Sequence, residues 1–410
     1  MKKILIILMA VVSVALVAFL GWYLFLRNPD IPTGMVIRNI LPFGSGDDIN
    51  IPAQPTGNGF GDGAGEEEPF DEFGLPTADL FRISNTPVAG ATIFTRNGQT
   101  VVRYVDRATG HIYDVDLGTL DKTKVTNNTL PKIYEAYFRS DRNAVLLRFL
   151  KDDSDTVENL SLTLTPPQAT SSTLYAVSST LLGGDISAVA VGSGNTLIYA
   201  RRDTSSIVTS TFNGTGARTL LTLPFTDWRL ATAGNSLVVY TKASANASGF
   251  AYTLNTSNGA FVKILGPLNG LVVIPSSIGN RVLYSYVEHN GTKAFAKNLT
   301  NNALAEISPA TLAEKCVWSA RNAGILFCGA PTDGLGIDEP DNWYRGATHF
   351  SDRIWLFDTN ISIAQVLTEP KRSLNIDIDV VEPKLSPGED YLIFINKTDL
   401  SLWALRLEQF

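Results

Sequence analysis

Acidic side chains that could bind a cation gather in the segment between residues 330 and 350. Asp333, Asp338 and Asp341 lie in this segment, and carboxylate oxygens are ligands that Ca²⁺ prefers. Their spacing differs from the Asp-x-Asp-x-Asp-Gly order of a calcium loop. A calcium site is therefore the weakest of three interpretations of this segment, and we expect the protein to have no cofactor.

The same segment carries residue types that dominate protein interfaces. Trp343, Tyr344, Arg345 and His349 occur within seven positions of one another, and Trp, Tyr and Arg are the types most enriched at binding hot spots. Long loops on a rigid scaffold often carry binding residues. We therefore expect a partner-binding loop with Trp343 and Arg345 at its centre. The alternative is that Trp343 and Phe350 only pack the loop onto the fold, while its acids face water.

Catalytic signatures are scarce in the rest of the chain. The three histidines, His111, His289 and His349, are far apart, and no Gly-x-Ser-x-Gly or His-Glu-x-x-His motif occurs. Asp377 and Asp379 lie two residues apart, on the same side of an expected strand, but this spacing alone does not make an acid–base pair. We expect a non-enzymatic binding protein. The alternative is a protein that binds or cleaves cell-surface glycan with loop carboxylates.

The two cysteines, Cys316 and Cys328, flank a turn centred on Asn322. Residues placed symmetrically about the turn of an antiparallel hairpin face each other directly, with Cα atoms about 4.5 to 5.5 Å apart. A disulfide accepts this separation. The hairpin therefore favours a disulfide over two buried thiols packed side by side.

The elements that must position these residues form a repeat. A short apolar strand, a turn and a second apolar strand recur seven times, with turn residues Asn97, Asn143, Asn195, Asn235, Asn280, Asn322 and Glu389. A period of about 40 to 50 residues with several strands in each unit is typical of a β-propeller blade. The sequence therefore predicts an all-β, seven-bladed propeller over residues 80–410. The segment 330–350 is the surplus length of its sixth blade.

The seventh blade lacks a fourth strand, because the chain stops directly after the strand expected near residues 401–407. An unpaired sheet edge invites aggregation. We therefore predict that residues 80–83 pair with this strand and close the ring.

One blade also carries a motif. Ser386-Pro387-Gly388-Glu389 precedes an apolar strand, and Leu402-Trp403 lies on the next strand. The order resembles the WD-repeat-like blades of bacterial TolB-type propellers, whose units typically read Ser-Pro-Asp-Gly. The resemblance implies a cell-envelope propeller that presents loops to partner proteins.

The N-terminal part of the chain has a different composition. Residues 4–26 carry no charge, and as a helix they would span a bilayer core of about 30 Å. Lys2 and Lys3 precede this run, which predicts a cytoplasmic N-terminus and an extracytoplasmic propeller. Residues 1–27 are thus expected to be a cytoplasmic tip and a single transmembrane anchor in the lipid bilayer, with a cleaved signal peptide as the alternative.

Residues 28–79 are rich in Pro, Gly and acids, and their ten acids and one base give a net charge of −9. Such a composition predicts a flexible linker. The remaining net charge of −1 on residues 80–410 offers no basic footprint for nucleic acid. The sequence therefore predicts an envelope scaffold anchored in the cell membrane, with protein partners in the envelope.

Overall fold

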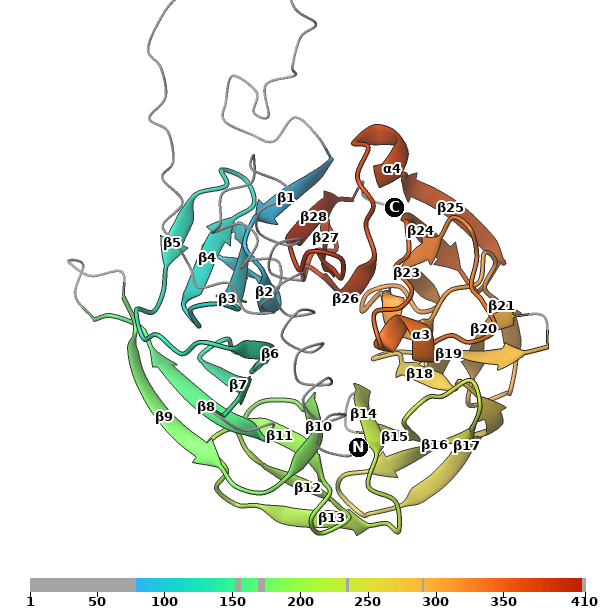
Figure 1. Cartoon of the computed structure of the whole chain (residues 1–410), viewed down its shortest axis with the longest axis horizontal. Coiled ribbons are helices and arrows are strands. Elements are labelled where there is room, and N and C mark those ends of the chain that lie inside the picture. The colour runs from blue at the N-terminus through green and yellow to red at the C-terminus, as the bar shows by residue number, and fades with distance from the viewer. Residues whose placement is uncertain (1–78, 152–155, 169–173, 234–235, 290, 408–410) are drawn as a thin grey trace, which may run out of the picture. The chain divides into compact units, whose positions relative to one another are not determined.

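The computed structural model describes residues 79–151, 156–168, 174–233, 236–289 and 291–407. Within these ranges the strands form seven four-stranded antiparallel sheets, arranged as blades around a central axis (Figure 1). The fold class predicted from the repeat is therefore confirmed. The expected anchor at 4–26, the linker up to residue 78 and the turn residue Asn235 lie outside the described residues.

In each of the first six blades the strands follow the order of the chain, from the centre of the ring to its rim. Blades one to three comprise β2 (Val88–Arg96), β3 (Gln99–Asp106), β4 (Ile112–Asp116) and β5 (Lys122–Lys124); β6 (Ile133–Phe138), β7 (Ala144–Leu150), β8 (Val157–Thr165) and β9 (Ala176–Leu182); and β10 (Ile186–Val191), β11 (Thr196–Arg201), β12 (Ser206–Thr211) and β13 (Arg218–Thr222). Blades four to six comprise β14 (Trp228–Ala233), β15 (Ser236–Thr241), β16 (Ser248–Asn255) and β17 (Phe261–Asn269); β18 (Val272–Pro275), β19 (Arg281–Glu288), β20 (Gly291–Asn298) and β21 (Leu304–Glu306); and β22 (Cys316–Trp318), β23 (Ile325–Pro331), β24 (Asp352–Asp358) and β25 (Ile363–Thr368).

The seventh blade joins the two ends of the domain. It comprises β26 (Val380–Leu385), β27 (Tyr391–Asn396) and β28 (Leu402–Arg406), and its outer strand is β1 (Leu80–Ser84). β1 runs antiparallel to β28, with Leu80 opposite Leu405 and Phe81 opposite Ala404. The predicted closure of the ring is therefore confirmed.

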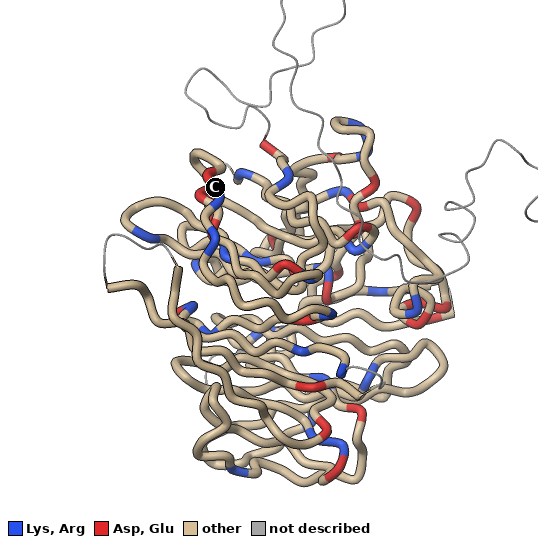
Figure 2. Tube along the Cα trace, turned by 60° about the vertical axis from the view of Figure 1, so that its left-hand side comes forward, with Lys and Arg blue, Asp and Glu red and all other residues tan. Residues whose placement is uncertain are grey.

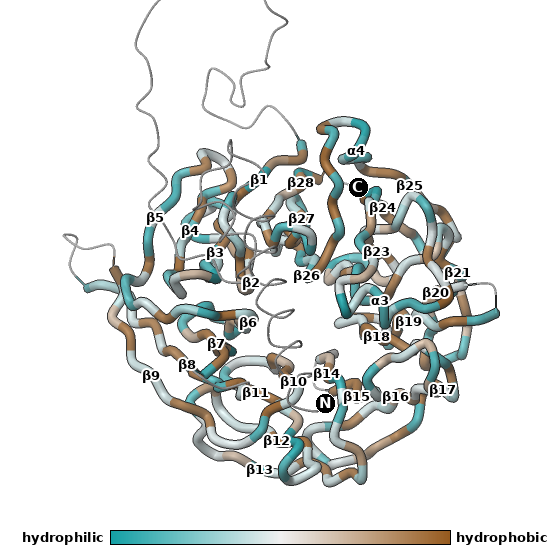
Figure 3. The backbone as a smooth tube through the Cα atoms, viewed as in Figure 1, coloured by the Kyte–Doolittle hydropathy of each residue, from teal (hydrophilic) through white to brown (hydrophobic). Residues whose placement is uncertain are grey.

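The core lies between the blades. Hydrophobic and hydrophilic residues are interspersed along the strands (Figure 3). Inner strands such as β3, β7 and β11 are mostly buried, whereas the outer strands β9, β13 and β25 are largely exposed. One cluster joins β1, blade six and blade seven through Leu80, Phe327, Leu356 and Trp403. Burial of large rings such as Trp403, which is 3% exposed, stabilises the packing between stacked sheets.

Charged residues of both signs are interspersed over the described part of the propeller (Figure 2). Within the described ranges no helix has both the length and the apolar composition needed to cross a membrane. The helices of blades six and seven are short, namely η1 (Ala313–Lys315), α3 (Asp341–Tyr344) and α4 (Pro370–Ser373). All three lie in connections between strands: η1 precedes β22, α3 lies between β23 and β24, and α4 lies between β25 and β26.

Candidate functional site

The candidate site is the blade-six insert, which we define as residues 332–351, together with the segments beneath it. The insert connects β23 to β24 and contains α3. Because neighbouring strands of the blade are antiparallel, the insert lies at the opposite end of the blade from the turn at Asn322. The segment that contains η1 and the segment that leads into β26 both reach this end (Figure 1).

A buried cluster of three charges fixes the insert to the propeller. The Lys315 ammonium lies 2.8 Å from Oδ2 of Asp352 and also pairs with Oδ1 of Asp379. All three side chains are 0% exposed. Lys315 ends η1, Asp352 begins β24, and Asp379 directly precedes β26. Buried ions are tolerated only when they are paired and hydrogen-bonded, so this cluster holds the three segments in one arrangement.

Hydrogen bonds from the insert complete the cluster. The indole Nε1 of Trp343 donates to both carboxylate oxygens of Asp379, at 3.0 and 2.9 Å. The backbone N–H of Phe350 donates to Oδ2 of the same carboxylate at 3.2 Å. Asp352 accepts from the backbone N–H of Val380 at 2.7 Å. The two carboxylates thus connect the middle and the end of the insert to blade seven.

Two aromatic rings cover the lysine. The Lys315 ammonium lies 5.0 Å from the ring centroid of Trp343 and 4.9 Å from that of Phe350. The two rings are stacked, with centroids 6.4 Å apart, and they form an apolar cluster with Leu312. Lys397 lies 5.2 Å from the Trp343 ring. Cations at these distances from a ring are attracted to its π-face.

This packing corrects the expectation that Trp343 lies at the centre of an exposed interaction surface. Its side chain is 3% exposed and Phe350 is 7% exposed. Trp343 and Phe350 therefore pack the loop onto the propeller, which is the alternative that the sequence left open. The physical reason is that the indole finds both an acceptor, Asp379, and a cation, Lys315, beneath the loop.

Burial raises the pKa of Asp352 to about 6, although the nearby Lys315 opposes this effect. Its Oδ1 has no hydrogen-bond partner among the described residues. Burial also raises the pKa of Glu314, against the hydrogen bond that Tyr344 donates to it. The cluster of Lys315, Asp352 and Asp379 therefore places two carboxylates around one ammonium group, and burial favours the protonated form of Asp352.

The outer side of the insert presents a different set of side chains, which we call the insert surface: Ile337, Tyr344, Arg345 and His349. Ile337 is 57% exposed and Tyr344 is 38% exposed. The Tyr344 hydroxyl donates to Glu314 at 2.5 Å, and Arg345 donates to the side-chain oxygen of Asn342 at 2.7 Å. The insert surface is therefore exposed while its tyrosine and arginine are held by neighbours.

The three aspartates of the insert do not share a site. Asp341 accepts a hydrogen bond from the backbone N–H of Ala245 at 2.5 Å and so ties α3 to blade four. Asp333 and Asp338 are exposed and line a cleft of about 460 Å³ together with His349. In the part of the chain that the structure describes, no group of three or more His, Cys, Asp or Glu side chains could hold a metal ion.

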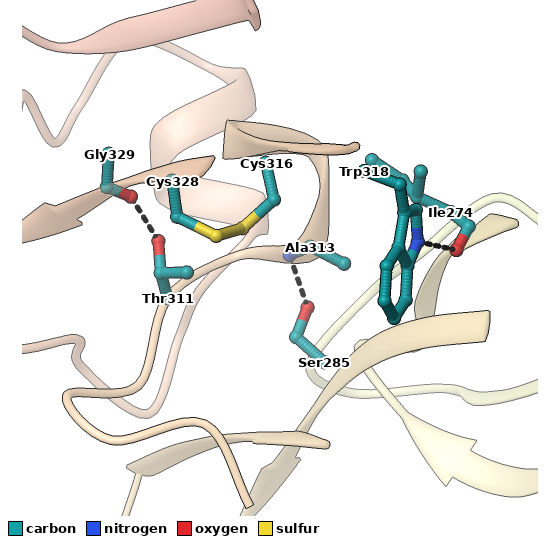
Figure 4. The surroundings of a disulfide bond; sticks show 8 residues. All are labelled: Ile274, Ser285, Thr311, Ala313, Cys316, Trp318, Cys328 and Gly329. Atoms are coloured by element: carbon teal, nitrogen blue, oxygen red, sulfur yellow. Dashed lines mark hydrogen bonds between the residues drawn. A yellow bond between two sulfur atoms is a disulfide. The ribbon is translucent and has the colours of Figure 1, made fainter. Parts of the chain in front are cut away.

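Cys316 and Cys328 face each other directly across β22 and β23 and are joined by a disulfide (Figure 4). Their Cα atoms are 4.1 Å apart, somewhat closer than the sequence predicted. Polar contacts surround the bond, as Thr311 donates to the carbonyl of Gly329 at 2.6 Å. The disulfide lies one residue beyond Lys315 and so reinforces the strand pair that carries the charge cluster.

Sequence reasoning missed Lys315 and Asp352 altogether and misread Asp379. Asp377 and Asp379 both precede β26, so they do not share one face of a strand. Asp377 is exposed and pairs with Lys371 at 2.8 Å, whereas Asp379 is buried. One feature of the sequence could have indicated the cluster. Lys315 and Asp379 directly precede a strand with apolar residues, and Asp352 begins one.

The architecture defines the protein as a seven-bladed β-propeller. No protein-family model and no curated protein matches the chain. Among solved structures, the chain is similar to an oligogalacturonate lyase from Vibrio parahaemolyticus, at 11% identity and a TM-score of 0.50 over 80% of this chain and 94% of that chain. A second oligogalacturonate lyase, in complex with manganese, gives 11% identity and a TM-score of 0.50 over 80% and 93%.

TolB from Acinetobacter baumannii is also similar to the chain, at 11% identity and a TM-score of 0.41. That similarity covers 76% of this chain and 64% of TolB. Identities this low show the shared fold alone. TolB is thus among the structural neighbours of the chain, and the propeller implied by the resemblance of blade seven is present.

Proposed function

We propose that the protein is a non-enzymatic scaffold of the cell envelope. In this proposal residues 4–26 anchor it in the membrane, residues 28–79 act as a tether, and the propeller lies outside the cytoplasm. There it binds a partner protein through the insert surface. The positive charges ahead of the apolar segment and the acidic linker support the topology.

The observation that carries the proposal is the fixation of the insert. A loop of 20 residues would lose much conformational entropy if it became ordered only on binding. Here Lys315, Asp352 and Asp379 hold the loop before any partner arrives. Preorganisation of this kind favours affinity because less entropy is lost in the complex. The types of residue that remain exposed, Tyr344 and Arg345, are those enriched at protein interfaces.

The glycan alternative requires carboxylates that a substrate can reach. One acid pair of the site, Asp352 and Asp379, is wholly buried and shares Lys315. These carboxylates hold the loop in place, so they do not support the glycan reading.

Affinity capture from envelope extract with the full-length chain tests the proposal. Arg345→Glu and Ile337→Asp should each reduce the recovered partner about tenfold or more, as expected for loss of roughly 1.4 kcal/mol or more of binding energy. Matched controls are Arg218→Glu on β13 and Leu304→Asp on β21, which change exposed residues on other blades. Equal recovery from all four variants and the unaltered chain would reject the insert as the binding surface.

A further inference from the structure

A cavity of about 520 Å³ lies on the inner side of the ring, and we call it the inner-strand cavity. Its lining comes from the innermost strands of five blades, namely β2, β6, β10, β14 and β26, and from Arg148 on β7 (Figure 1). Cavities of this size hold small organic molecules. The lining residues belong to blades one, two, three, four and seven, so the cavity is separate from the insert of blade six.

Two ion pairs line the cavity. The guanidinium of Arg148 lies 2.6 Å from a carboxylate oxygen of Glu135, and the ammonium group of Lys384 lies 3.5 Å from a carboxylate oxygen of Glu382. These four charges balance one another within the lining. The fifth charged residue of the lining, Arg229, therefore decides the sign of the cavity.

Arg229 is the second residue of β14 and is half-buried in the cavity wall. Its guanidinium donates a hydrogen bond to the carbonyl of Trp228 at 3.3 Å. Among the described residues, no carboxylate lies within ion-pair distance of this guanidinium. Burial raises the pKa of Glu314, and the hydrogen bond from Tyr344 and the charge of Arg229 oppose this effect, so Glu314 and Arg229 interact only at longer range. An anion that enters the cavity can therefore form the ion pair that Arg229 lacks.

The backbone is irregular where it borders the cavity. The register of strand pairing shifts at Ser187 on β10 and at Glu382 on β26. Glu382 has a φ value of 51°, which residues other than glycine rarely adopt. Bulges change the direction of side chains and are frequent next to active sites. These irregular positions therefore support a role of the cavity in binding.

Much of the remaining lining is apolar. Val189 and Val191 on β10 and Leu230 on β14 contribute to the wall. One unpaired cation beside an apolar wall fits a ligand that is anionic at one end and apolar at the other.

We propose that the inner-strand cavity binds a small organic monocarboxylate. The carboxylate pairs with Arg229, because a guanidinium matches a carboxylate with two parallel hydrogen bonds. The apolar part of the ligand lies against Val189, Val191 and Leu230. The single unpaired charge favours one carboxylate over two. This site goes beyond the scaffold function and does not depend on it, since no residue of the insert takes part.

Titration of the full-length chain with phenylacetate, followed by ligand-observed NMR, tests the proposal. Phenylacetate has one carboxylate and one apolar ring, and its neutral amide, phenylacetamide, has nearly the same shape. Phenylacetate should bind saturably with a Kd below about 10 mM, and phenylacetamide should bind at least about tenfold more weakly. Absence of saturable binding, or equal binding of the two compounds, would overturn the proposal. This comparison uses the unaltered chain, so it does not depend on the folding of any variant.

Variants of Arg229 show whether its charge is responsible. Arg229→Gln should weaken the binding of phenylacetate at least about tenfold, and Arg229→Lys, which keeps the charge, should weaken it less. The matched control is Arg218→Gln, which removes an exposed arginine of β13 outside the cavity and should bind phenylacetate as the unaltered chain does. Undiminished binding by Arg229→Gln, or an equal loss of binding in the control, would overturn the assignment of the site to this cavity.

Discussion

Replacing Asp352 with Asn should change how the stability of the propeller depends on pH. Burial raises the pKa of Asp352 to about 6 from an ordinary value of 3.8. Between pH 3.8 and about pH 6, Asp352 therefore carries a proton in the folded state and has lost it in the unfolded state. Folding stability from this group is fully present below the unfolded pKa and is lost as the pH rises through the folded pKa.

The magnitude follows from the two pKa values. One pKa unit corresponds to about 1.4 kcal/mol, so the full effect is roughly 3 kcal/mol, of which about 2 kcal/mol falls between pH 4.5 and pH 7.5. An asparagine side chain has no proton to gain in this pH range, so the Asp352→Asn variant should lack this contribution. Relative to the unaltered protein, the variant should become about 2 kcal/mol more stable as the pH rises from 4.5 to 7.5.

Urea unfolding of the full-length protein, followed by tryptophan fluorescence at several pH values, measures this difference. The control is Asp377→Asn, because Asp377 is exposed and its hydrogen bond with Lys371 lowers its pKa. The stability that Asp377 contributes is lost only as the pH falls below the ordinary pKa of an aspartate, 3.8. The stability difference between Asp377→Asn and the unaltered protein should therefore change little between pH 4.5 and pH 7.5. A difference below about 0.5 kcal/mol for Asp352→Asn would refute the reasoning.

Two further predictions concern the strand that closes the ring and the disulfide. Deleting residues 80–84 should lower the melting temperature measured by calorimetry by at least ~5 °C, because it removes the buried side chains of Leu80 and Phe81, each worth about 1.5 to 3 kcal/mol, and unpairs β28. A deletion of residues 45–65 should leave the melting temperature unchanged. Equal melting temperatures for the two deletion variants would contradict the closure of the ring by β1. Replacing both Cys316 and Cys328 with Ala should lower the free energy of unfolding, measured in urea, by less than ~3 kcal/mol beyond the loss of packing, since strand pairing already holds the short loop between them. Two alkylated thiols in the unreduced protein would show that the disulfide is absent under native conditions.

The architecture could be predicted because it depends on local patterns. Apolar alternation marks each strand, and several turns require a backbone conformation that favours Asn. Asn97 and Asn280 have φ values of 53° and 47°, in the left-handed region where Asn is several-fold enriched. Closure by β1 followed from counting strands, since a missing fourth strand must be supplied from elsewhere.

The charge cluster could not be predicted in the same way. Lys315 and Asp379 are 64 residues apart in the chain, and no periodicity connects them. Whether a charged residue at the start of a strand faces water or a buried partner depends on where a long insert folds back. Trp343 shows the same limit, because its residue type suits an exposed interface as well as a buried contact.

The pairing of β1 with β28 delays the closure of the ring until the end of synthesis. Leu402, the first residue of β28, follows Ser84 by 318 residues. At about 5 to 20 residues per second, the ribosome needs roughly 15 to 60 s to make the intervening chain. Throughout this time the apolar strand at Leu80 and Phe81 has no native partner, although other blades can already pair their own strands. The nascent chain must therefore keep its first strand from pairing elsewhere until its last strand emerges.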